Sequence, residues 1–102
     1  MVQDFVEVNQ VRLPIVKEGG EIYYPVSYLG SRVLLKDLKG NQLKRNGYGE
    51  YLKQFEIDFG EGIGGINLSY CISEVGLRKI LSNSRIGGLS EDQKIAMNGL
   101  LK

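Results

Sequence analysis

Two pairs of alternating segments, each pair joined by glycines, restrict the fold of this chain more than any other feature of its sequence. Segments 11–16 and 22–26 flank the turn Glu18-Gly19-Gly20-Glu21, and segments 55–59 and 66–72 flank a glycine-rich tract. Alternation of apolar and polar residues indicates half-buried strands, and glycine turns between such strands indicate hairpins. We therefore expect two β-hairpins, with segment 5–8 as an additional strand before the first.

Capping residues indicate helices around these hairpins. Ser27 is a suitable N-cap for a short helix through about Leu38, with Gly40-Asn41 at its end. Segment 42–49 is polar and basic and contains the turn signal Asn46-Gly47, so we expect an exposed loop there, and residues 50–54 can add a turn of helix.

Two more helices are expected toward the C-terminus. Ser73 can cap a helix in which Leu77, Ile80 and Leu81 form an apolar stripe, ending at Gly87-Gly88. A capping box at 90–93 opens a final helix through Leu101. Residues 1–102 are thus predicted to form one compact α+β domain of short antiparallel strands and three to four short helices.

The inventory of reactive side chains argues against an enzyme. The chain has no histidine and a single cysteine, Cys71. This excludes Ser-His-Asp and Cys-His nucleophiles and zinc sites built on several Cys or His ligands. Cys71 lies in an apolar run and is expected to be a buried core residue. We predict a protein that acts by binding and needs no cofactor.

Two motifs with chemical potential have simpler structural explanations. The tract 60–65 matches the dinucleotide pattern G-x-G-x-x-G, but an alternating strand follows it where that motif requires a helix. Glu56 and Asp58 share one face of a strand, as residues of a solvated surface do. The sequence also lacks a signal peptide and an apolar run of about 20 residues, so we expect a location in the cytoplasm and no membrane contact.

Positive charge is segregated along a chain whose net charge is only +1. Residues 32–53 carry six cations against two acids, a local charge of +4, and residues 78–102 carry five against two, a charge of +3. The intervening residues 54–77 carry four acids and no cation. If folding joins the two basic stretches, they form a patch that attracts phosphates; otherwise they are a solvated basic surface, an equally acceptable explanation.

The basic side chains are the candidate DNA-binding residues, and Tyr48 and Tyr51 lie among them in the sequence. They are Lys36, Lys39, Lys44, Arg45, Lys53, Arg78, Lys79 and Arg85.

Two segments, about half of the chain, resemble the Bro-N domain, a module at the N-terminus of many phage antirepressors and baculovirus repeated proteins. The first runs from Val8-Asn9-Gln10-Val11 through Glu21-Ile22-Tyr23-Tyr24-Pro25-Val26 to Leu29-Gly30. The second runs from Ile72-Ser73-Glu74-Val75-Gly76-Leu77 to Ser82-Asn83-Ser84-Arg85. The resemblance implies a mixed fold and DNA binding in a phage or prophage regulatory setting.

Two hypotheses follow for the partner. The first is a phage-type regulator, such as an antirepressor, that binds double-stranded DNA mainly through phosphate contacts. The alternative is a protein-interaction module that captures a repressor or host factor, through an exposed strand edge near Pro14 or through the helix that holds Leu100 and Leu101. A homodimer is compatible with both.

Overall fold

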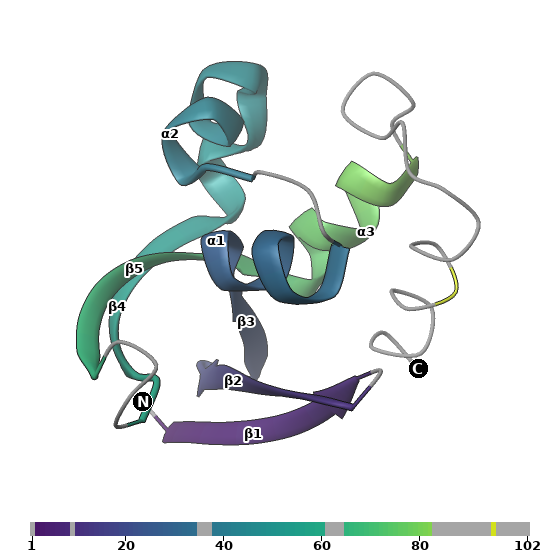
Figure 1. The fold of residues 1–102 in the computed structure, drawn as a ribbon. Coiled ribbons are helices and arrows are strands. Elements are labelled where there is room, and N and C mark those ends of the chain that lie inside the picture. Colours follow the sequence, from purple (N-terminus) through teal and green to yellow (C-terminus); the bar gives the residue numbers. More distant parts are fainter. Residues whose placement is uncertain (1, 9, 35–37, 61–64, 83–94, 96–102) are drawn as a thin grey trace.

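The computed structural model describes residues 2–8, 10–34, 38–60, 65–82 and 95, and it confirms the α+β fold. Five antiparallel strands form one sheet in the order β1-β2-β3-β5-β4 (Figure 1). The strands are β1 Val2–Val8, β2 Val11–Glu18, β3 Glu21–Pro25, β4 Leu52–Asp58 and β5 Ile66–Ser73. Because β1 and β4 are the outer strands, all other strands have a neighbour on both sides.

Three short helical regions accompany the sheet among the residues that the structure describes. They are α1 Val26–Leu29 with its continuation η1 Gly30–Leu34; α2 Gly40–Leu43 with η2 Lys44–Tyr48 and η3 Gly49–Tyr51; and α3 Glu74–Ser82. In the part of the chain that the structure describes, none of these helices has the length and hydrophobicity of a membrane span.

Both predicted hairpins are present. Gly19 and Gly20 have φ angles of 59° and 79°, the left-handed backbone that a two-residue hairpin turn requires and that glycine adopts without strain. In the second hairpin, Asp58 pairs with Ile66, and the Phe59 N–H donates to the carbonyl of Gly65 at 2.8 Å. A strand follows Gly65, as expected from the alternation.

Pro14 does not mark an edge strand, because β2 lies between β1 and β3. Pro14 pairs with Phe5 of β1, and the pairing of β2 with β3 begins only at Val16. Proline has no N–H to donate, and at this point β2 has no ladder partner in β3. An internal strand therefore accommodates Pro14 at a position where only its β1 side is paired.

The predicted helix boundaries around residues 27–40 are wrong. The N-cap of α1 is Pro25, and Ser27 lies inside the helix. Leu38 is not helical, and Gly40 begins α2 instead of ending a helix. A Cβ on Gly40 would lie 2.5 Å from the Cβ of Tyr70, so this glycine permits close packing of α2 on β5.

Segment 42–49, predicted as an exposed loop, is mostly helical. Leu43 and Tyr48 are buried in the core, while the side chains between them face solvent. Gly47 interrupts the helical backbone with a φ of 93°, which accounts for the turn signal. The loop was predicted because most residues of this segment are polar. Leu43 and Tyr48 are its two large apolar residues, and their burial stabilises the helical conformation.

Helix α3 begins as predicted. The Ser73 hydroxyl accepts a hydrogen bond from the N–H of Gly76 at 3.2 Å, the usual N-cap contact. Leu77 and Ile80 are buried. The expected helix end at Gly87-Gly88 lies outside the described residues, as does the final helix except for Ile95.

The two faces of the sheet bury separate cores. The helical face, which α1, α2 and α3 cover, buries one cluster of described residues that includes Ile15, Tyr24 and Ile72. The opposite face buries Val16 of β2 and Phe55 of β4 together with Tyr23, Ile57 and Cys71. Because β2 and β4 are not neighbours in the sheet, their shared core means that the sheet curls around this second face, which we call the concave face. Cys71 is fully buried there, as predicted, and burial raises its pKa to about 12.

A glutamine side chain links the two outer strands across the concave face. The Gln3 amide of β1 donates to the carbonyl of Asp58 at 2.8 Å and accepts from the N–H of Asp58 at 3.0 Å. This pair of bonds imitates strand pairing between β1 and β4. The curled sheet is therefore nearly closed at this end.

Candidate nucleic-acid interface

Folding brings the two basic stretches together at a contact between α3 and η3. A Cβ on Gly76 would lie 2.4 Å from the Cβ of Tyr51, so only glycine allows the two segments this close. The Lys79 ammonium lies 5.9 Å from the centre of the Tyr51 ring, within the range of a cation–π interaction. The Tyr48 ring lies 6.5 Å from that of Tyr51.

Lys79 lies at this contact, and Lys44 and Arg45 belong to η2, the segment directly before η3; we call Lys44, Arg45 and Lys79 the helical basic surface. All three side chains are exposed. The Cγ of Lys44 lies 3.5 Å from the position that a Cβ on Gly49 would occupy, two residues before Tyr51. Lys39, also exposed, precedes α2 as its N-cap residue.

Arg78 is near this surface but contributes less net charge. Its guanidinium forms an ion pair with Glu74 one helical turn earlier, at 3.2 Å. The pKa of the neighbouring Tyr24 is raised to about 12, mainly by burial and also by the Glu74 carboxylate, while the Arg78 guanidinium opposes the rise. The Arg78 charge is thus partly compensated within α3.

Lys53 lies on the other side of the sheet. In β4 it pairs with Cys71, which places its side chain on the concave face, away from α3. There its ammonium lies 5.6 Å from the centre of the Tyr23 ring and 3.8 Å from the Glu18 carboxylate. Strand alternation therefore separates Lys53 from the helical basic surface. Lys36 and Arg85 lie outside the described residues.

Strand β4 carries two acidic side chains that face solvent. Glu56 and Asp58 are exposed, and the Asp58 carboxylate accepts the N–H of Gly60 at 2.9 Å. Within the described ranges, no three acidic or cysteine side chains gather where they could hold a metal ion. The carboxylates belong to a solvated strand face, as the sequence indicated.

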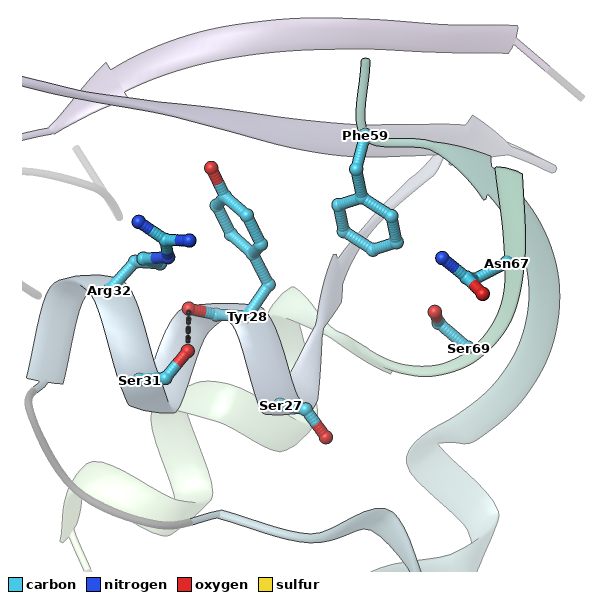
Figure 2. A pocket seen from close by; sticks show the side chains of 7 residues that line it. All are labelled: Ser27, Tyr28, Ser31, Arg32, Phe59, Asn67 and Ser69. Atoms are coloured by element: carbon cyan, nitrogen blue, oxygen red, sulfur yellow. Dashed lines mark hydrogen bonds between the residues drawn. The ribbon is translucent and has the colours of Figure 1, made fainter. Parts of the chain in front are cut away.

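A groove on the concave face is the main feature that sequence reasoning missed. One cavity of about 320 Å³ lies between α1–η1 and the adjoining ends of β4 and β5, and a second of about 490 Å³ continues it over β1 and β2. Both are lined by Tyr28, Arg32 and Phe59. Figure 2 shows Phe59 between Tyr28 on the helix and Asn67 and Ser69 on β5.

Planar side chains follow one another along this groove. The Arg32 guanidinium lies 5.6 Å from the centre of the Tyr28 ring, and the rings of Tyr28 and Phe59 stack at 5.2 Å with 26° between their planes. At the other end, the Arg12 guanidinium lies 4.0 Å from the centre of the Phe5 ring. The only local signal was the spacing of Tyr28 and Arg32, four residues apart on a helix.

Comparison with protein-family models, with curated proteins and with solved structures gives no match. The resemblance to the Bro-N domain therefore stays a prediction.

Proposed function

We propose that this chain is a DNA-binding regulatory protein that holds the phosphates of double-stranded DNA with the helical basic surface. The observation that carries the proposal is the contact of Tyr51 with Gly76, because it joins cations from two separate stretches of sequence. A local cluster of cations attracts a phosphate backbone even when the whole protein is nearly neutral. The resemblance to the Bro-N domain supports the same function.

The residues have distinct roles in this proposal. Lys44, Arg45 and Lys79 each neutralise a phosphate, and Asn46, exposed beside the first two, is placed to add a hydrogen bond. Because phosphate contacts carry no sequence information, they set affinity and position instead of the choice of site.

Salt dependence of duplex binding tests the proposal. We expect the logarithm of the affinity for a labelled duplex to fall with the logarithm of salt concentration with a slope of about −2.7 for three phosphate contacts. The double variant Lys44→Gln, Arg45→Gln should retain a slope of about −0.9 and bind all duplex sequences more weakly. Fluorescence anisotropy measures both quantities.

Lys53→Gln is the matched control, since it removes one positive charge from the opposite face of the sheet. It should leave duplex affinity unchanged. Absence of salt-sensitive binding at micromolar protein, or an equal loss of affinity in Lys53→Gln and in Lys44→Gln alone, would contradict the proposal.

Two exposed apolar residues favour a second candidate, the capture of a protein partner such as a repressor. Ile66 and Leu68 project from the same face of β5 with 69% and 64% of their surface exposed. Adjacent exposed apolar side chains often belong to protein interfaces. Co-purification with a repressor that Leu68→Ser abolishes, without any response to duplex DNA, would favour this candidate over the first.

A further inference from the structure

The groove on the concave face is large enough for a small ligand. Its two cavities, of about 320 and 490 Å³, meet at Tyr28, Arg32 and Phe59. Ligand sites in proteins have volumes of about 300–1,000 Å³. The groove therefore has room for a ligand with two chemically different parts, one in each cavity.

Its aromatic side chains suit a flat ligand. Arg32, Tyr28 and Phe59 present three planar groups in a row (Figure 2). The Arg32 Cζ lies 5.6 Å from the centre of the Tyr28 ring, and the centres of the Tyr28 and Phe59 rings lie 5.2 Å apart. Nucleobases stack on aromatic rings and on guanidinium planes, and this stacking depends little on which base is present.

The two arginines suit an anion. Arg12 and Arg32 are both exposed, and among the residues that the structure describes neither forms an ion pair with a carboxylate. Glu7 of β1 lies opposite Arg12 in the sheet, and no ion pair joins the two side chains. Arginine is well suited to binding phosphate because its fork of N–H groups matches two phosphate oxygens.

Polar groups complete the lining of the smaller cavity. Ser27 and Ser31 come from the helical side, and Asn67 and Ser69 come from β5 (Figure 2). Ser31 uses its hydroxyl to reach the carbonyl of Tyr28 at 3.5 Å. Hydroxyl and amide side chains can donate to and accept from the edge of a base.

We propose that this groove binds a nucleotide unit, with the base stacked against Phe59 and Tyr28 and the phosphate held by Arg12 and Arg32. The nucleotide is either free or an unpaired unit of a single strand. Because the groove opens on the concave face and uses none of the helical basic surface, this inference goes beyond duplex binding and does not rest on it.

Nuclear magnetic resonance titration with three probes tests the proposal. The probes are thymidine 5′-monophosphate, a short thymidine oligonucleotide, and 2-deoxyribose 5-phosphate, which lacks the base. We expect a nucleotide probe to shift the signals of Tyr28, Phe59 and Ser69, and the sugar phosphate to bind at least about tenfold more weakly.

The probes also identify the source of the ligand. Binding of the free nucleotide identifies a nucleotide site, and binding of the oligonucleotide alone identifies a single-strand site; both support the groove. If neither nucleotide probe shifts the groove signals, or if the sugar phosphate binds as tightly as the nucleotide, the proposal is wrong.

Variants locate the contacts. Arg32→Gln and Phe59→Leu should each weaken nucleotide binding by about tenfold, and Arg12→Gln, at an exposed side chain, provides a second test if Phe59→Leu does not fold. Lys17→Gln is the matched control: it removes a positive charge from the same strand as Arg12, on the helical face.

The control should bind nucleotide like the unaltered chain. Arg32→Gln should leave duplex affinity unchanged, which separates a failure of this inference from a failure of the proposed function. Equal nucleotide affinities of Arg32→Gln, Arg12→Gln and Lys17→Gln would overturn the groove assignment.

Discussion

Gly76→Ala should destabilise this protein, although the same change in an open helix is stabilising. Alanine favours the helix over glycine by about 1 kcal/mol. At this position, however, its Cβ would lie 2.4 Å from the Cβ and 2.7 Å from the Cγ of Tyr51, and 2.9 Å from the Cγ1 of Ile72. The Tyr51 Cβ is bonded directly to the backbone, so no side-chain rotation removes the first overlap.

The size of the effect follows from two opposing contributions. Overpacking of a well-packed site costs about 1–3 kcal/mol, and the fixed position of the Tyr51 Cβ places this case in the upper part of that range. After the gain in helix propensity of about 1 kcal/mol, a net loss of about 1–2 kcal/mol remains. In a domain of this size, that corresponds to a melting temperature lower by about 5–15 °C.

Thermal unfolding followed by circular dichroism measures this loss, with Gly49→Ala as the matched control. Gly49 has a helical φ of −57°, and its nearest neighbouring atom would be the Cγ of Lys44 at 3.5 Å, an ordinary contact. Alanine should therefore stabilise the protein there by about 0.4–1 kcal/mol. A melting temperature for Gly76→Ala equal to or above that of the unaltered chain would refute the close approach of α3 to Tyr51.

Three further changes test the sheet and its two cores. Gln3→Ala removes both hydrogen bonds to Asp58 and should lower the free energy of unfolding by about 1 kcal/mol in urea denaturation, whereas an unchanged value would mean that the linked edges add nothing. Gly20→Ala places a side chain at a φ of 79° and should cost about 1–2 kcal/mol in the same assay, with a neutral result excluding the turn geometry. Burial raises the pKa values of Cys71 and Tyr24 to about 12 from ordinary values of 9.0 and 10.0, so the folded state holds these protons more tightly than the unfolded state. Their contribution to the free energy of unfolding is complete below about pH 9 and is lost as the pH rises toward 12. Urea denaturation at several alkaline pH values should show this decline in the free energy of unfolding, and a value independent of pH would contradict it.

The hairpins and the start of α3 could be predicted because their signals are local. Gly19 and Gly20 supply the positive φ angles of a turn between two alternating segments, and Ser73 caps the helix that follows it directly. Gly40 was misread because its role depends on Tyr70, which is distant in sequence and adjacent in the fold. A glycine that ends a helix and a glycine that admits a neighbouring side chain have the same appearance in a sequence.

The candidate sites were only partly predictable for a similar reason. The segregation of charge identified the stretches that meet at Tyr51, but the side of the sheet on which each cation lies depends on strand register. Lys53 illustrates this, since its place in β4 directs it to Tyr23 and Glu18 and away from Lys79. The groove gave almost no signal, because the residues that form it are far apart along the chain.

The curl of the sheet explains how so small a domain can present two separate binding surfaces. Contact of Val16 with the β4 core residues curls the sheet, and the Gln3 amide holds its outer strands together at one end. Helix α1 begins at the end of β3, where it buries Val26 and Leu29 on the helical face and extends Tyr28 toward the concave face. The core on the concave face therefore ends in an open groove and not in a closed interior. The helices on the other face complete the main core and carry their cations outward, so neither surface depends on the residues of the other.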